Sequence, residues 1–100
     1  MKNLVIALLL MAPALASAED DGNELLGFMQ NPGSRDVAMM YVEAARKEWD
    51  GTLFCVTGGD PQKLAFDAVR QYLESHPEQR YRPRRYLIIQ GLRTGYPCKP

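Results

Sequence analysis

The sequence contains few of the side chains from which catalytic and metal sites are usually built, with one histidine and two cysteines in 100 residues. His76 stands just before Pro77 at a predicted helix end, where it can interact with the last carbonyls of that helix. One histidine and two cysteines are one ligand short of a four-ligand structural zinc site. The carboxylates are scattered, and Gly58-Gly59 lacks the lysine and hydroxyl of a phosphate-binding loop. We therefore expect a non-enzymatic protein with no catalytic residue, metal or cofactor.

The sequence also lacks an apolar run of about twenty residues, the length that a helix needs to cross a membrane. A shorter apolar run over residues 4–11 follows Lys2 and leads to the small residues Ala16-Ser17-Ala18. This order is typical of a secretory signal peptide. An uncleaved anchor is the alternative, and the Ala-x-Ala site argues against it. We expect cleavage after Ala18, one domain over residues 19–100, export from the cytoplasm, and no stable membrane span afterwards.

The two cysteines, Cys55 and Cys98, lie 43 positions apart in the part of the chain that cleavage would retain. Outside the reducing cytoplasm, an even number of cysteines predicts a disulfide more readily than a metal site or redox centre. The 82 residues that remain form a small domain whose apolar core alone gives marginal stability. Closing a loop of this length contributes roughly 4 kcal/mol. We predict a Cys55–Cys98 disulfide; two free thiols are the alternative, which requires that the protein is not exported.

Turn and capping residues divide the retained chain into four predicted helices. These cover residues 24–30 with Asn23 as a cap, the stretch from Ser34 to near Gly51, residues 61–75 with Asp60 as a cap, and residues 83–94. Residues 19–22 are predicted to be a frayed terminus, residues 52–57 an extended connection, and residues 78–82 a polar linker. The sum is an all-α fold, a small single-domain bundle of about four helices crosslinked by one disulfide.

Apolar residues at helical spacing give the expected core. The inward face of the second predicted helix is expected to contain Val37, Met40, Tyr41, Ala44, Ala45 and Trp49. Its outward face is expected to contain Glu43, Arg46, Lys47 and Asp50. The later helices are expected to contribute Leu64, Val69, Tyr72, Ile88 and Leu92. Two interpretations fit Trp49 and Phe54, which border the turn at Gly51: core residues, or partly exposed anchors for a partner.

Charge is distributed unevenly, with nine acids and three bases in residues 19–60 and eight bases and three acids in residues 61–100. Attraction between the halves of one domain and two charged binding faces explain this equally well. The densest basic signal comprises Arg80, Arg82, Arg84 and Arg85, interleaved with Tyr81 and Tyr86. Arginine and tyrosine are favoured at protein interfaces, so an acidic protein, anionic lipid or a second subunit are candidate partners. The alternative is a solvated linker with both tyrosines packed inward; export argues against nucleic acid.

Several motifs between residues 54 and 98 occur in one combination. They are Phe54-Cys55, Leu64, Tyr72-Leu73-Glu74-Ser75-His76-Pro77-Glu78, Leu87, Leu92 and Tyr96-Pro97-Cys98. In order and spacing they resemble the Rap/Tai-type immunity proteins of type VI secretion, and Asn23-Glu24-Leu25-Leu26 resembles the mature start of that family. Two features depart from the family pattern: a second cysteine pair is missing near Met29 and Ala38, and Thr57 stands where the family tends to have proline.

The resemblance implies a periplasmic inhibitor, often a homodimer, that sterically blocks a peptidoglycan-cleaving effector, typically a cysteine amidase. The candidate partner-binding residues lie in the loop after the second helix and in the arginine cluster: Phe54, Thr57, Gly58, Gly59, Asp60, Arg80, Arg82, Arg84 and Arg85. The alternative function is a small periplasmic stress chaperone or adaptor, also helical, that binds many unfolded clients.

Overall fold

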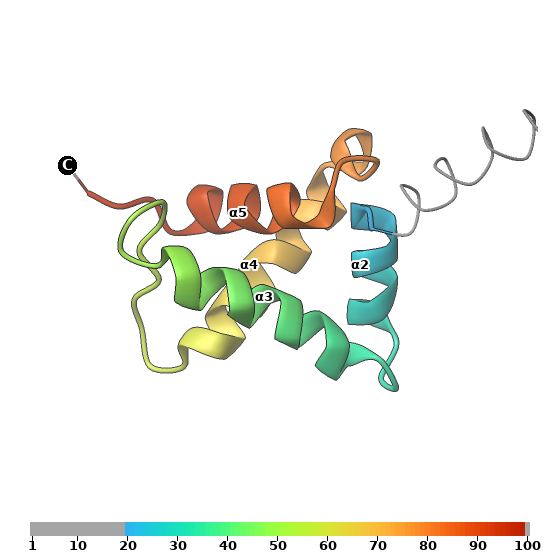
Figure 1. Cartoon of the computed structure of the whole chain (residues 1–100), viewed down its shortest axis with the longest axis horizontal. Helices are drawn as coiled ribbons and strands as arrows, with labels where there is room; N and C mark the ends of the chain where they lie inside the picture. Colours follow the sequence, from blue (N-terminus) through green and yellow to red (C-terminus); the bar gives the residue numbers. More distant parts are fainter. Residues whose placement is uncertain (1–19, 100) are drawn as a thin grey trace, which may run out of the picture.

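Four α-helices and one 3₁₀ turn make up the fold in the computed structural model, which describes residues 20–99. The elements are α2 (Gly22–Gln30), α3 (Arg35–Trp49), α4 (Pro61–Ser75), η1 (Pro77–Gln79) and α5 (Arg84–Gly95). Helix α3 crosses α4, α5 lies along the other side of α4, and α2 closes one end (Figure 1). The all-α prediction is thus confirmed, and the predicted signal peptide lies outside the described residues. Within residues 20–99, no helix is long and apolar enough to cross a membrane.

Local capping explains where α4 begins and ends. Asp60 accepts a hydrogen bond from the Lys63 backbone N–H, and Pro61 occupies the first turn, where its missing N–H leaves no bond unmade. At the other end, Pro77 disfavours a helical conformation at His76, whose N–H bonds the Tyr72 carbonyl. Both boundaries are those that the sequence predicts.

The start of α2 differs from the prediction. Asp21, not Asn23, caps the helix, because its carboxylate accepts a hydrogen bond from the Glu24 N–H at 3.0 Å. Residues 20–22 are also not frayed: the Asp20 carbonyl accepts from the Arg84 N–H at 2.7 Å, and the Gly22 N–H donates to the Arg82 carbonyl at 3.2 Å. This pairing fastens the start of α2 to the segment that precedes α5.

A glycine allows that pairing to be close. A Cβ at Gly22 would lie 3.1 Å from the Arg80 carbonyl oxygen and 3.2 Å from the Arg80 Cα, and it would overlap the Leu87 side chain. Backbone atoms cannot yield as a flexible side chain can, so any larger residue would push α2 away from residues 80–82. Gly91 has the same role between α5 and α4, where a Cβ would lie 3.1 Å from the Val69 Cα.

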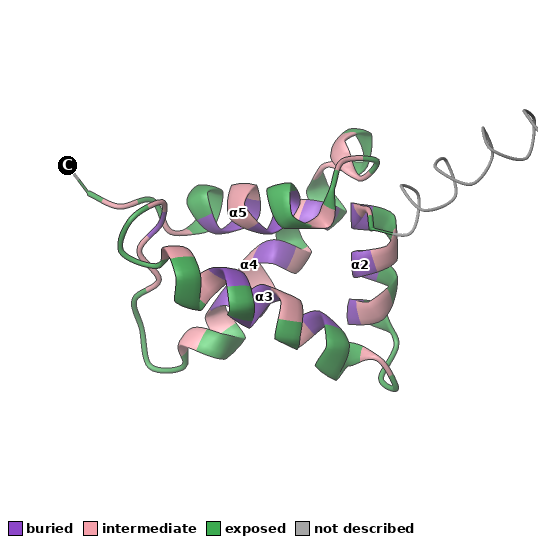
Figure 2. Ribbon diagram, in the orientation of Figure 1, coloured by how far each residue is buried: buried purple, intermediate pink, exposed green. Residues whose placement is uncertain are grey.

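The core lies between all four helices (Figure 2). Its buried apolar residues are Leu25, Leu26, Met29, Ala38, Val42, Ala45, Phe54, Ala65, Phe66, Val69, Leu73, Leu87, Ile88 and Leu92. Val69, Ile88 and Leu92 are buried as predicted, whereas Leu64 and Tyr72 are half-buried. Phe66, absent from the predicted core, is buried with its ring 5.9 Å from the Arg35 guanidinium carbon.

Helix α3 faces the core with a stripe that overlaps the predicted one in part. Of the predicted inward residues, Ala45 is buried, and Tyr41 and Trp49 are half-buried and pack against the core. The others are exposed: Ala44, Val37 at 37% and Met40 at 68%. Ala38 and Val42 are buried in their place, so the helix is rotated relative to the prediction.

Glu43 is also inside rather than outside, with only 6% of its surface exposed. Arg46 compensates this burial with two hydrogen bonds, Nε to Oε2 at 2.7 Å and Nη2 to Oε1 at 2.8 Å. The bond from Arg46 lowers the pKa of the Glu43 carboxyl below its ordinary value of 4.5, and burial opposes that shift without cancelling it. Because this carboxyl has a lower pKa in the folded protein than in the unfolded chain, its ionisation stabilises the fold at pH values above the unfolded-state pKa. The stabilisation is lost as the pH falls through the folded-state pKa.

Replacing Arg46 by methionine is expected to lower the free energy of unfolding at pH 7 by about 1–3 kcal/mol, because a buried carboxylate loses its charged donor. Without Arg46, burial raises the pKa of Glu43 above its ordinary value. The deficit relative to wild type should therefore shrink as pH falls from 7 to 4, which urea unfolding at each pH measures. Lys47→Met, on the exposed side of the same helix, is the control and should stay within about 0.5 kcal/mol of wild type. A loss of stability that is the same at every pH would contradict the role of Arg46 in lowering the pKa of Glu43.

The predicted disulfide joins Cys55 to Cys98, with 4.9 Å between their Cα atoms. It is reinforced by a backbone hydrogen bond from the Cys55 N–H to the Tyr96 carbonyl at 2.8 Å. The crosslink thus ties the loop after α3 to the chain just beyond α5. Phe54, next to Cys55, is completely buried, so of the two interpretations for this ring the structure selects the core.

Candidate protein-binding surface

The loop between α3 and α4 presents Thr57, Gly58 and Gly59 to solvent. Gly58 has a φ of 145°, a conformation that favours glycine, and a Cβ at this position would overlap the Leu64 side chain. Asp60 is exposed, but its carboxylate caps α4. Because Phe54 is buried, it offers no side-chain surface to a partner and is removed from the candidate residues.

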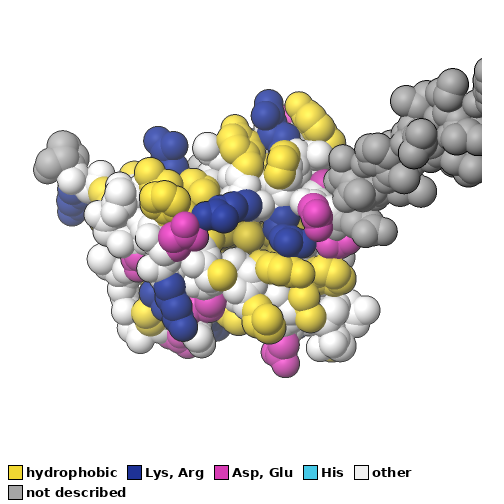
Figure 3. Space-filling model, in the orientation of Figure 1, with side chains coloured by type: hydrophobic (Ala, Val, Ile, Leu, Met, Phe, Trp, Pro, Cys, Tyr) yellow, Lys and Arg dark blue, Asp and Glu magenta, His cyan; other side chains and the backbone are white. Residues whose placement is uncertain are grey.

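Two of the four clustered arginines are engaged within the chain. Arg85 places Nη2 at 2.8 Å from both carboxylate oxygens of Glu48 on α3. Arg84 lies with its guanidinium carbon 3.7 Å from the centroid of the Tyr41 ring and Nη1 at 3.6 Å from Asp20 and from Glu24. These pairs join the basic half of the sequence to the acidic half, so attraction within one domain is the explanation that the structure favours. Figure 3 shows acidic and basic side chains side by side on this face.

The other two arginines differ. Arg82 donates from Nε to Gln79 Oε1 at 2.6 Å, and its guanidinium carbon lies 5.4 Å from the centroid of the Tyr81 ring and 5.1 Å from that of Tyr86. The tyrosines are 68% and 40% exposed, so the alternative in which both rings pack inward is wrong. Arg80 is half-buried, and its Nε has no hydrogen-bond partner within the described residues.

The structure does not bring the two predicted contact regions together. The loop of residues 57–60 lies near the C-terminal end of α5, to which Cys55 is tied, whereas residues 80–85 lead into its N-terminal end (Figure 1). A helix of 12 residues is about 18 Å long. One partner surface of ordinary size, about 800 Å² per side, can still span that distance.

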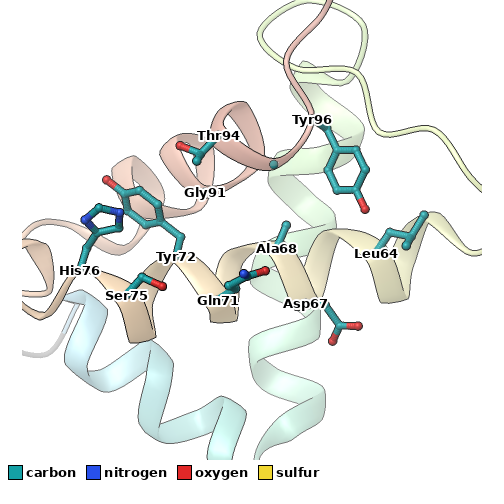
Figure 4. A pocket seen from close by; sticks show the side chains of 11 residues that line it. Leu64, Asp67, Ala68, Gln71, Tyr72, Ser75, His76, Gly91, Thr94 and Tyr96 are labelled. Carbon is teal, nitrogen blue, oxygen red and sulfur yellow. The ribbon is translucent and has the colours of Figure 1, made fainter.

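A hollow of about 400 Å³ lies between α4 and α5, and the sequence analysis did not predict it. Figure 4 shows Tyr72 and His76 toward one end and Leu64 and Tyr96 toward the other. Its further lining is mostly small or polar: Asp67, Ala68, Gln71, Ser75, Gly91, Thr94 and Gly95. Two spacings in the sequence could have indicated this hollow. Polar residues recur every four positions along α4, and two glycines are four positions apart on α5, as Gly91-x-x-x-Gly95. Asp67 is paired with Lys63 at 3.1 Å, so the remaining polar groups are hydroxyls, an amide and an imidazole.

His76 does not form part of a catalytic arrangement. Its Nδ1 lies 3.0 Å from Glu78 Oε2, and its ring centroid lies 4.5 Å from that of Tyr72. The pKa of Glu78 is lowered, first by its own backbone N–H and then by the His76 side chain. Within residues 20–99, no three His, Cys, Asp or Glu side chains gather as a metal site would require. The exposed loop, the Arg82 surface and the hollow are the places in the described residues at which another molecule could make contact.

Comparison with known families agrees with this geometry. The model of the Rap1a immunity proteins matches residues 21–98. The chain belongs to the Rap1a immunity protein family. No curated protein and no solved structure matches the chain. The Rap1a match begins at the residue that caps α2 and ends at the second cysteine of the disulfide, so it covers all four helices and the crosslink. Membership of the Rap1a family points to an immunity function against secreted effectors and to a cognate effector protein as the partner.

Proposed function

We propose that this chain is a periplasmic, non-enzymatic immunity protein that binds one cell-wall hydrolase, a peptidoglycan amidase delivered by type VI secretion, and blocks its active site sterically. The observation that carries the proposal is the family match over residues 21–98. The surfaces that we assign to this contact are the exposed side chains of Thr57 and Tyr81 and the half-buried side chain of Arg82. The proposal needs no chemistry from the chain itself, because occupation of the effector's active site suffices to inhibit it.

Two observations support inhibition by binding rather than by reaction. Both cysteine sulfurs are bonded to each other, so neither is available as a nucleophile. The ring of the single histidine contacts Glu78 and Tyr72 instead of a group that it could activate. A rigid scaffold with exposed anchors also suits a tight inhibitor, because little conformational freedom is lost on binding.

The periplasmic location rests on two features of the chain. Residues 1–18 have the pattern of a signal peptide, and disulfides such as Cys55–Cys98 persist in oxidising compartments. We expect the periplasmic fraction of the native host to contain a product that starts at Glu19, as intact mass will measure. A full-length product with both thiols free would contradict the proposed location.

The deciding experiment uses the mature chain, residues 19–100, to capture a cell-wall hydrolase and then assays peptidoglycan cleavage by the captured enzyme. We expect one stoichiometric complex at neutral pH and complete loss of hydrolysis. Binding without inhibition would contradict steric blocking. Weak binding to many unfolded proteins at low pH, without a single complex, would instead favour the chaperone or adaptor alternative.

We also propose that two copies of the chain pair through the outer stripe of α3, where Met40 is exposed beside a hollow of about 410 Å³. The hollow is lined by Met39, Met40, Glu43, Ala44, Lys47 and Gln62. A two-fold axis would place the Met40 of each copy in the hollow of the other, which makes the patch self-complementary. Light scattering after gel filtration should give a dimer for wild type and a monomer for Met40→Lys; a monomeric wild type would contradict the pairing.

A further inference from the structure

Tyr81, Arg82 and Tyr86, here named the Tyr-Arg-Tyr cluster, form a surface group at the start of α5, in which both tyrosines are exposed and Arg82 is half-buried. The Arg82 guanidinium carbon lies 5.4 Å from one ring centroid and 5.1 Å from the other. In Figure 3, basic and apolar side chains project together along the upper edge, near the start of α5. Large aromatic rings exposed beside a guanidinium are the composition of an interaction surface rather than of an ordinary solvated turn.

Within residues 20–99, Arg80 and Arg82 have no carboxylate partner, and of these two only Arg82 lies beside the tyrosine rings. Arg84 and Arg85 each meet carboxylates of the same chain, so their charge is compensated internally. Within residues 20–99 the Arg82 side chain has one hydrogen bond, from Nε to the neutral amide of Gln79, and no carboxylate pairs with it. The two terminal nitrogens of the guanidinium therefore remain free to donate. A planar guanidinium with both terminal nitrogens free matches the geometry of a carboxylate.

The backbone beneath the cluster is fixed. The Arg82 N–H donates to the Gln79 carbonyl at 3.0 Å, and the Arg82 carbonyl accepts from the Gly22 N–H at 3.2 Å. Two residues earlier and two residues later, Arg80 and Arg84 make further backbone hydrogen bonds to residues 23 and 20. The side chain of Arg82 is aligned as well, since Gln79 holds its Nε at 2.6 Å. A group already held in place loses little freedom on binding, which favours affinity.

From this geometry we infer that the Tyr-Arg-Tyr cluster is the main anchor for the effector and that it takes an aspartate or glutamate side chain exposed on that protein. The carboxylate lies against the terminal nitrogens of Arg82, and the tyrosine rings cover its apolar surroundings and exclude water. The inference rests on the proposed immunity function, because that function supplies a protein partner. It adds the chemistry of the contact: an acidic patch with apolar residues around it.

The test measures, by calorimetry, the affinity of the hydrolase captured by the wild-type chain for variants of the mature chain. Arg82→Ala should weaken binding at least about 30-fold, and Tyr81→Ala and Tyr86→Ala about 10-fold each. Arg82→Lys should also lose about 10-fold, because an ammonium keeps the charge but cannot bind a carboxylate with two parallel hydrogen bonds. The matched control is Arg35→Ala, an exposed arginine on α3 that also lies beside an aromatic ring, 5.9 Å from the Phe66 centroid; its affinity should stay within about threefold of wild type.

Urea unfolding of every variant distinguishes the loss of a binding contact from the loss of the fold. Because the substituted side chains lie at the surface, the urea midpoint of each variant should stay close to that of wild type. If wild type binds the hydrolase and Arg82→Ala binds equally well, the inference is overturned while the immunity function stands. If wild type neither binds nor inhibits the hydrolase, the proposed function fails and the inference fails with it. A loss for Arg82→Ala that Arg82→Lys restores completely would overturn the carboxylate geometry.

Discussion

Replacing Cys55 and Cys98 together by alanine is expected to lower the free energy of unfolding by about 4 kcal/mol. The bond closes a loop of 43 positions that contains α4, η1 and all of α5, and the unfolded chain without it gains the freedom of that whole loop. For a domain of this size, each kilocalorie corresponds to about 4–8 °C, so the melting temperature should fall by roughly 15–30 °C. Urea and thermal unfolding followed by circular dichroism measure both quantities.

Reduction supplies the control for that result. Wild type in excess dithiothreitol should unfold along the curve of the double alanine variant, and the variant itself should not respond to the reductant. A double variant within about 1 kcal/mol of wild type would mean that the helices hold the loop without the crosslink. In that case the hydrogen bond from Cys55 to the Tyr96 carbonyl and the burial of Phe54 would be the dominant restraints on this end of the molecule.

Replacing Phe54 by alanine is expected to lower the free energy of unfolding by about 3–5 kcal/mol, because a completely buried aromatic ring leaves a cavity that its neighbours fill only in part. Phe54 and Thr57 were both predicted to contact a partner, so Thr57 provides the matched control for Phe54. Thr57→Ala, at an exposed position of the same loop, should change stability by no more than about 0.5 kcal/mol. Denaturant unfolding of both variants, with unchanged slopes, gives the comparison.

A change in binding without a change in stability would mean that the Phe54 side chain contacts the partner instead of the core. A Phe54→Ala variant that keeps its unfolding midpoint but no longer binds the hydrolase would make the ring a contact residue. It would also require the loop to open when the partner binds. The burial of the ring predicts instead that affinity survives wherever the variant remains folded.

The sequence predicted the helices well because their ends depend on neighbouring residues. Asp60-Pro61 and His76-Pro77 act through local hydrogen bonds and the fixed φ of proline, so α4 begins and ends where these residues predict. The cap of α2 was misassigned because Asp21 and Asn23 are both good capping residues. The choice depends on residues 82–84, which hold residues 20–22 in position from 60 positions away along the chain.

The inward face of α3 could not be predicted from its own residues. Apolar residues lie on more than one side of the helix, and hydrophobicity favours the side with Val37 and Met40, whereas packing against the other helices buries Ala38 and Val42. The burial of Glu43 follows from the same rotation. In the candidate surface, the density of arginines was visible in the sequence. The sequence did not show which of these arginines are paired within the chain, because the partner of Arg85, Glu48, lies 37 positions away.

The pairing of residues 20–22 with residues 82–84 has a practical consequence for anyone who handles this protein. Whatever is attached ahead of Asp20 emerges beside the Tyr-Arg-Tyr cluster, so an affinity tag or a sensor-chip linkage there would shield the very surface under test. The opposite extremity, beyond Cys98, is at the far end of the molecule (Figure 1). Immobilisation through that extremity leaves the cluster accessible, and a comparison of the two orientations reports on the location of the docking surface without any substitution.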